Sequence, residues 1–151
     1  MEPIPAILVL EDGRSFTGQS FGAGGEVIAE AVFVTQMTGY QEILTDPAYR
    51  GRLVVATAPH IGNTGWNDED GHAEEITVAG YVVRDPSPRP SSWRSQRSLD
   101  DELTAQGIVA IAGVDTRALT RHLRDHGPLR AGISTTDLDP ASLVERVRGN
   151  A

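Results

Sequence analysis

Two histidines, His122 and His126, are four residues apart in the string His-Leu-Arg-Asp-His. On a helix this spacing places both imidazoles on one face, and with Asp125 they loosely match an inverted zinc-protease motif in which Asp replaces Glu. No third ligand is evident in the sequence, and Arg121 and Arg124 would repel a cation. We therefore favour a basic helix C-terminus, where positive side chains complement the helix dipole.

Three arginines of the same segment, Arg117, Arg121 and Arg124, fall on one helical stripe. The apolar side of this segment carries Ala118, Leu119 and Leu123. Two interpretations of the stripe stay open. It is either a solvated face or a docking surface, because the guanidinium fork pairs well with carboxylates across interfaces.

A glycine-rich run at residues 22–25 has the composition of a phosphate-binding loop. A dinucleotide fingerprint needs its next glycine three positions after Gly24, where Val27 stands instead. A Walker loop needs a lysine, and the chain contains none. The run therefore predicts a turn that uses positive φ angles.

Three consecutive acids, Asp68, Glu69 and Asp70, lie in a long polar stretch over residues 59–75. Glycine and glutamate do not fall at the offsets that a calcium loop requires, which favours a solvated loop. A second acidic pair, Glu42 and Asp46, has helical spacing and would serve as general acid and base if one pocket held both. A carboxylate-based enzyme is therefore an open alternative.

Covalent catalysis finds little support in the residue types. The chain has no cysteine, so a thiolate nucleophile is excluded. No Gly-x-Ser-x-Gly elbow is present to expose a serine nucleophile. We find no catalytic constellation that stands on its own.

Charge and composition exclude further classes. A formal net charge of −8 disfavours nucleic-acid binding through phosphate repulsion, and 5% aromatic residues leave few stacking platforms. The start of the chain has no basic region, and its apolar run at residues 4–10 is too short for a signal peptide or a membrane span. We expect a cytoplasmic protein with no membrane partner, and 151 residues suit one domain.

The first part of the chain predicts β structure and the last third predicts alternating helices and strands. An Asp12-Gly13 hairpin turn separates the first two expected strands. The expected strands cover residues 6–10, 15–21, 27–35, 53–58, 76–84, 108–112 and 129–134. Helices are expected over residues 99–106, capped by Ser98, from Asp115 to about His126, and over 141–148 after Asp139-Pro140. Residues 85–95 form a proline- and serine-rich connector.

Several runs in this chain match one known family in order and approximate spacing. They are Leu8–Gly13, Met37–Pro47, Pro59–Asn63 with Gly65, Asn67 and Asp68, and Val114–Arg117 followed by Leu119–Arg121 and Leu123–Arg124. On these residues the chain resembles the N-terminal domain of the carbamoyl-phosphate synthetase small subunit. The resemblance spans nearly the whole chain.

The resemblance implies a mixed α/β fold, namely a layered β/β/α swivelling-type domain over residues 1–151, with the C-terminal glutaminase domain absent. In this family the small subunit hydrolyses glutamine with a cysteine nucleophile. Ammonia then passes through a tunnel to the large subunit, a ligase that uses bicarbonate, ATP and magnesium to make carbamoyl phosphate for arginine and pyrimidine synthesis. The fragment itself is expected to carry no cofactor and no activity.

The resemblance also implies site residues. The family commonly has a serine after Asp-Pro that contacts the glutamine held by the glutaminase domain, and here that position is Ala48, so only a backbone contact is expected. The match includes Arg117, Arg121 and Arg124, which favours interpreting the stripe as a docking surface or as part of a structural ion pair. Expected partners are the large subunit, the missing glutaminase domain and, indirectly, L-glutamine. A free-standing small-ligand-binding module with glycine-rich loops is a further alternative.

Overall fold

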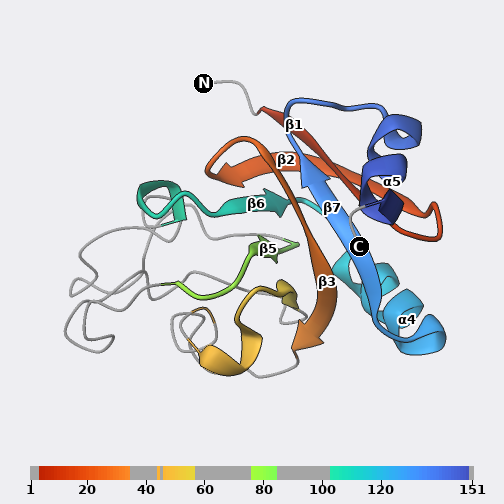
Figure 1. Ribbon diagram of the computed structural model, residues 1–151, viewed down its shortest axis with the longest axis horizontal. Coiled ribbons are helices and arrows are strands. Elements are labelled where there is room, and N and C mark those ends of the chain that lie inside the picture. The colour runs from red at the N-terminus through yellow and green to blue at the C-terminus, as the bar shows by residue number, and fades with distance from the viewer. Residues whose placement is uncertain (1–3, 35–43, 45, 57–75, 85–102, 150–151) are drawn as a thin grey trace.

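Seven strands close into a barrel in the computed structural model, which describes residues 4–34, 44, 46–56, 76–84 and 103–149 (Figure 1). Around the barrel the strands follow the order β1-β2-β6-β5-β4-β3-β7. They are β1 (Pro5–Leu10), β2 (Ser15–Gly22), β3 (Glu26–Val34), β4 (Leu53–Ala56), β5 (Gly80–Val82), β6 (Val109–Ala112) and β7 (Leu129–Ser134). The helical elements with defined bounds are η1 (Pro47–Tyr49), α4 (Thr116–His126) and α5 (Pro140–Gly149).

The first hairpin forms where the sequence predicts it. Gly13 adopts a φ of 98°, and its N–H donates to the carbonyl of Leu10 at 2.8 Å. The Asp12 carboxylate accepts from the backbone N–H of Arg14 at 3.1 Å. Strands β1 and β2 then pair antiparallel, so the Asp12-Gly13 turn is confirmed.

Parallel and antiparallel pairing divide the barrel. The pairs β3–β4, β4–β5 and β5–β6 are parallel, and every residue of β4, β5 and β6 is buried. Strand β2 pairs antiparallel with β1 and β6 and alternates between buried and more exposed positions. This contrast is the usual one between parallel strands covered on both faces and antiparallel strands that meet water on one face.

The barrel interior holds the largest apolar cluster. All seven strands contribute to it, and the helix α4 adds Leu119 and Leu123. Alternation along each strand sends the neighbouring residues outward, so Ile7 and Val9 of β1 pack instead against Leu143 of α5. A third cluster on the outer side of β4, β5 and β6 includes Leu44 and Leu103.

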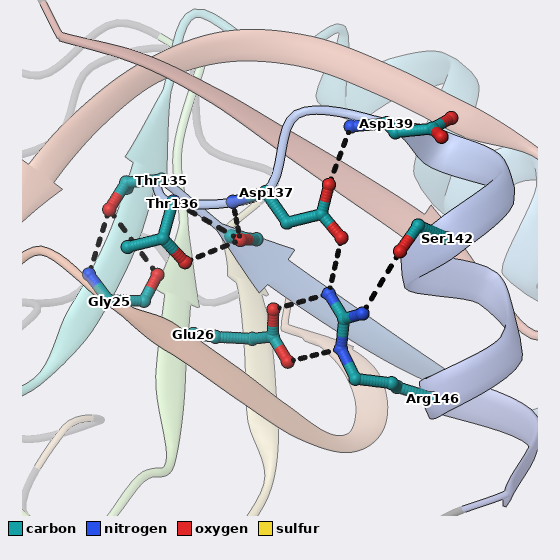
Figure 2. A network of polar contacts seen from close by, with 9 residues as sticks. Gly25, Glu26, Thr135, Thr136, Asp137, Asp139, Ser142 and Arg146 are labelled. Carbon is teal, nitrogen blue, oxygen red and sulfur yellow. Dashed lines mark hydrogen bonds and ion pairs between the residues drawn. The ribbon is translucent and has the colours of Figure 1, made fainter.

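The helix α5 is held to the barrel by an ion-pair network (Figure 2). The guanidinium of Arg146 donates to both carboxylate oxygens of Glu26, at 2.8 and 2.7 Å, and to Asp137 at 2.8 Å. It also donates to the hydroxyl of Ser142 at 3.1 Å. The start of β3 is thereby tied to α5 and to the segment between β7 and α5 (Figure 2).

The glycine-rich run is a turn, as predicted. Gly22 and Gly25 have φ angles of 79° and 131°, which favour glycine. The N–H of Gly25 donates to the hydroxyl of Thr135 at 2.8 Å (Figure 2). The run therefore forms the turn between β2 and β3, as the missing glycine and lysine of the phosphate-binding motifs predicted.

Most predicted elements are confirmed, and their ends differ by a residue or two. The strand at 129–134 and the helix from Asp115 to His126 match the observed bounds. The strand expected over 76–84 is too long, because only Gly80–Val82 pairs with neighbouring strands. Thr77 and Ala79 donate their N–H groups to Leu44 and Arg52 instead of joining the ladder.

Several predicted features fall outside the described residues. They include the loop over 59–75, the connector over 85–95, the Ser98 cap, the first part of the helix over 99–106 and the ends of the strands expected to reach 35 and 58. The mixed α/β class is confirmed, whereas the layered swivelling-type arrangement remains a prediction beside the observed barrel. No helix in the described ranges is long and apolar enough to span a bilayer.

Candidate docking surface

The helix α4 begins at an aspartate cap. The carboxylate of Asp115 accepts from the N–H of Ala118 at 3.0 Å, and its carbonyl accepts from Leu119 at 3.0 Å. The carboxylate bond satisfies the N–H of Ala118, which has no partner within the helix, and the carbonyl bond is the first bond of the helix itself. Leu119 and Leu123 enter the barrel core, which fixes the rotation of α4 about its axis.

That rotation turns three arginines outward. Arg117, Arg121 and Arg124 are exposed, and together with Thr120 they line an open pocket of about 340 Å³. We call these four residues the α4 pocket. Among the described residues, none of the three guanidinium groups forms an ion pair. The predicted stripe is therefore an exposed positive surface with no acidic partner in the described part of a chain whose net charge is −8.

An aromatic ring orients one of these arginines. The guanidinium carbon of Arg124 lies 5.4 Å from the centre of the Phe33 ring, at the end of β3. A cation over an aromatic face is attracted to the ring quadrupole. The contact limits the freedom of Arg124 before any partner arrives, and it leaves the donors at the guanidinium edge available.

One residue of the α4 pocket, Thr120, has a buried hydroxyl that is closed to solvent. Thr120 is 6% exposed, and its Oγ1 atom has no hydrogen-bond partner. Buried polar groups without a partner are uncommon, because the lost hydration is not replaced. The sequence interpretation missed Thr120. The available signal was a threonine between two arginines of the stripe, close to the apolar side.

The two histidines of α4 have a structural role. Nε2 of His122 lies 2.6 Å from a carboxylate oxygen of Asp12, and the rings of His122 and His126 have centres 4.4 Å apart. The described ranges contain no group of three or more His, Cys, Asp or Glu residues that could hold a metal ion. Arg124 and His126 occupy the last turn, so the predicted basic helix C-terminus is confirmed.

The electrostatics of Asp12 reflect its position beside α4. Partial burial raises its pKa, but the N–H of Arg14 and the ring of His122 stabilise the carboxylate by more, so the pKa lies below its ordinary value. Asp12 is therefore ionised where it meets His122. This contact anchors α4 to the β1–β2 hairpin.

A second predicted site residue, Ala48, lies in the short helix η1. It is exposed, and its N–H donates to the carboxylate of Asp46 at 2.9 Å. Its side chain carries no functional group, and its N–H is already satisfied. Any backbone contact from Ala48 to a ligand therefore has to use the carbonyl oxygen.

Thr77 supports the η1 segment through hydrogen bonds to residues on both sides of it. The hydroxyl of Thr77 donates to the carbonyls of Leu44 and Asp46, at 3.2 and 2.9 Å. Its N–H also donates to Leu44 at 2.8 Å, and its carbonyl accepts from Gly51 at 3.0 Å. Thr77 thus ties both sides of η1 to the barrel, a role that the sequence interpretation missed.

Of the remaining acidic candidates, only Asp46 lies in the described part of the chain. Asp46 uses a carboxylate oxygen to cap η1, while Glu42, Asp68, Glu69 and Asp70 lie outside the described residues. A general acid–base pair of Glu42 and Asp46 therefore stays a prediction without a structural test.

Comparison with known proteins points in one direction. Residues 8–133 match the family model described as "Carbamoyl-phosphate synthase small chain, CPSase domain". The carbamoyl phosphate synthase small chain of Streptomyces avermitilis is 64% identical over 147 residues, covering 96% of this chain and 39% of that protein. Those of Streptomyces coelicolor and Mycobacterium tuberculosis are each 60% identical, covering 95% of this chain and 38% or 39% of theirs.

The chain thus spans about two fifths of the length of the curated relatives it matches. Among solved structures, a peptidase M28 precursor from Shewanella amazonensis aligns with a TM-score of 0.45 at 10% identity, covering 88% of this chain and 36% of that one. A likeness at that level carries no argument about fold or function.

Proposed function

Since this chain belongs to the carbamoyl-phosphate synthase small chain family, we propose that it is the N-terminal assembly domain of such a small chain. In this role it docks on the large subunit and borders the glutamine site, and it breaks no bond itself. The absence of cysteine supports this division, because the family's thiolate nucleophile then has to come from the glutaminase part. The match to the N-terminal part of the relatives agrees with it.

The observation that carries the proposal is the exposed positive face of α4. Arg117, Arg121 and Arg124 are exposed without an ion pair among the described residues. Their helix is clamped in orientation by Leu119 and Leu123 in the core. A row of exposed guanidinium groups on a helix of fixed orientation suits recognition of carboxylates on a partner protein.

The complete scheme follows from the family. The small subunit releases ammonia from glutamine, and the large subunit combines it with bicarbonate at the expense of ATP, with magnesium on the large subunit. A docking domain serves this chemistry by keeping water away from the path of ammonia, which requires a well-packed interface. The domain needs no cofactor of its own for that task.

Ala48 has a limited place in this proposal. Its carbonyl oxygen is the one backbone group that remains for the glutamine held by the glutaminase domain, because its N–H is bonded to Asp46. Thr77 holds the carbonyl in position through its bonds on both sides of η1.

The test is to mix the small chain with its large subunit and follow complex formation by light scattering after gel filtration. We expect a stable complex, and we expect Arg117→Ala combined with Arg121→Ala to weaken it. Arg50→Ala is the matched control, because Arg50 is exposed at the end of η1 and lies outside α4. Equal loss of affinity in the control, or no complex at micromolar concentration, would contradict the docking role of α4.

The alternatives from the sequence gain no support. Of the acidic pair Glu42 and Asp46, only Asp46 lies in the described residues, where one of its carboxylate oxygens caps η1. A glycine-rich binding module would need the run at residues 22–25 to face a ligand, and this run serves as a turn between two strands.

A further inference from the structure

The dipeptide Asp12-Gly13 at the first hairpin turn has a covalent chemistry of its own. The backbone nitrogen that follows an aspartate can attack the side-chain Cγ of that aspartate and close a succinimide ring. Glycine in the second position favours this attack, because it has no Cβ atom to crowd the approach. The turn is therefore a place where the chain can modify itself, unless the fold prevents it.

We propose that Asp12 is a site of slow isomerisation to isoaspartate, and that the contact from His122 holds this reaction back in the folded chain. The inference is independent of the proposed function. It concerns the hairpin of β1 and β2 and its contact with α4, and it needs no partner protein.

The reaction balances with water alone. The Gly13 nitrogen forms a bond to Cγ of Asp12, and the amide proton leaves with the carboxyl hydroxyl as one water molecule. Water then opens the succinimide at either carbonyl carbon. Opening at Cγ restores aspartate, whereas opening at the original backbone carbonyl leaves the main chain running through Cγ, which is isoaspartate. The Asp12 side chain is 34% exposed, so water can reach the ring.

Two hydrogen bonds within the hairpin oppose the attack. The N–H of Gly13, which has to lose its proton, donates to the carbonyl of Leu10 at 2.8 Å. The carboxylate of Asp12 is held through Oδ1, which accepts from the N–H of Arg14 at 3.1 Å. Both bonds join residues of the same turn, so they open together when the turn frays. Local structure alone therefore gives limited protection.

The third restraint comes from a distant part of the chain. Nε2 of His122 lies 2.6 Å from Oδ2 of Asp12. Because an ionised carboxylate only accepts hydrogen bonds, this nitrogen is the donor. The His122 side chain is 13% exposed and belongs to α4, which is fixed by Leu119 and Leu123 in the barrel core. His122 therefore holds the carboxylate when the bonds of the turn open.

The surroundings of Asp12 also disfavour its reactive form. Loss of the hydroxyl as water requires the protonated carboxyl group. Partial burial raises the pKa of Asp12, but the N–H of Arg14 and the ring of His122 lower it by more. At neutral pH the protonated fraction is then smaller than in the unfolded chain, which slows ring closure further.

Isomerisation would remove the anchor of α4. Isoaspartate lengthens the backbone by one methylene at the turn where β1 and β2 pair, and its carboxylate branches directly from Cα. The carboxylate would then no longer sit where His122 meets Asp12. Damage at the hairpin would thereby loosen the helix that carries the arginine stripe.

The experiment incubates the small chain in heavy-oxygen water at neutral pH and physiological temperature. Each passage through the succinimide adds one heavy oxygen at residue 12, and mass spectrometry of the digested chain measures that uptake together with isoaspartate. We expect uptake in the folded wild type to be at least about tenfold slower than in the urea-unfolded chain. The other Asp-Gly pair of the sequence, Asp70-Gly71, is read from the same digest as a reference for the incubation.

Variants of α4 separate the His122 contact from general stability. His122→Phe keeps a ring and removes the donor, and we expect uptake at least about fivefold faster than in wild type. His122→Gln keeps an N–H donor and should stay within about twofold of wild type. His126→Phe, which changes the neighbouring ring, and Asp115→Ala, which weakens the helix cap, are the controls and should also stay within about twofold.

Several outcomes would overturn the inference. Wild-type uptake in folded His122→Phe would remove the role of His122, and so would an equal acceleration in Asp115→Ala. Equal uptake in the folded and the unfolded wild type would show that the fold does not hold the reaction back. No uptake at residue 12 of the unfolded chain would remove the site itself. Circular dichroism checks that each variant is folded, and His122→Leu carries the same expectation if His122→Phe does not fold.

Discussion

Arg146 and Glu26 form a two-pronged ion pair across 120 residues of sequence, with N–O distances of 2.8 and 2.7 Å (Figure 2). The same guanidinium reaches Asp137 at 2.8 Å. Two hydrogen bonds between a planar fork and a carboxylate restrict geometry more than a single contact does. The pair therefore sets where α5 lies along the start of β3, in addition to the apolar contacts of Leu143 and Val147.

The network predicts sensitivity to acid. The bond from Arg146 lowers the pKa of Glu26 below its ordinary value of 4.5. Bonds from Ser142, Arg146 and the N–H of Asp139 lower the pKa of Asp137 from 3.8 to about 2. A carboxylate with a lowered pKa in the folded state contributes stability that is present above its unfolded pKa. That stability is lost as pH falls from about 4.5 toward about 2.

Glu26→Gln tests this linkage. We expect a loss of about 0.5–1 kcal/mol at neutral pH, after allowing for solvent screening, and a smaller fall in unfolding temperature between about pH 5 and pH 3 than in wild type. Thermal melts at both pH values measure it. Glu145→Gln, on the exposed side of α5, is the control. Parallel pH profiles of wild type and Glu26→Gln would contradict the linkage.

We predict that Gly18, which lies where β2 pairs with β6, does not tolerate substitution by a residue with a side chain. A Cβ atom at Gly18 would lie 2.3 Å from the carbonyl oxygen of Ala112 and 3.0 Å from Ile111 Cγ1. The carbonyl belongs to the backbone of the paired strand, so it can move only with that strand. We expect Gly18→Ala to destabilise the chain by about 1–3 kcal/mol, read from the urea midpoint. Gly149→Ala, which meets nothing within 4 Å, should keep the wild-type midpoint.

The cap of α4 predicts a moderate loss of stability. Asp115→Ala removes the carboxylate that accepts from the N–H of Ala118 and should cost about 1 kcal/mol. Asp115→Ser keeps a capping oxygen and should cost only a few tenths of that. Chemical unfolding measures both, and hydrogen exchange at the first turn of α4 shows where the change lies. Equal stability of Asp115→Ala and wild type would mean that the cap is not needed here.

The support behind η1 predicts a local effect. Thr77→Val removes the hydroxyl bonds to the carbonyls of Leu44 and Asp46 and should cost about 1 kcal/mol. Amide exchange at Tyr49 and Gly51 should become faster, because both N–H groups belong to the segment that Thr77 holds. Thr17→Val, at an exposed position of β2, is the control. Unchanged exchange around η1 would refute the anchoring role of Thr77.

Local patterns in the sequence predict much of the secondary structure. Asp12-Gly13 marks the first hairpin, Asp115 marks the start of α4, and Gly127 marks its end. These signals work because turns and caps are satisfied by residues close in the chain. The strand predicted over residues 76–84 is too long, because contacts with distant residues decide where strand pairing begins. Ile76, Thr77 and Val78 have the residue types of a strand. The N–H of Thr77 nevertheless bonds to Leu44 and that of Ala79 to Arg52.

By itself the sequence determines the family, the mixed class and the stripe of Arg117, Arg121 and Arg124, since these depend on residue types and short spacings. Tertiary structure alone decides that the strands close into a barrel, that Arg124 rests on Phe33 and that the hydroxyl of Thr120 is buried without a partner. It also decides that Arg146 pairs with Glu26 from the other end of the chain. Each of these depends on contacts between distant segments, which form only when the whole chain buries its apolar faces together.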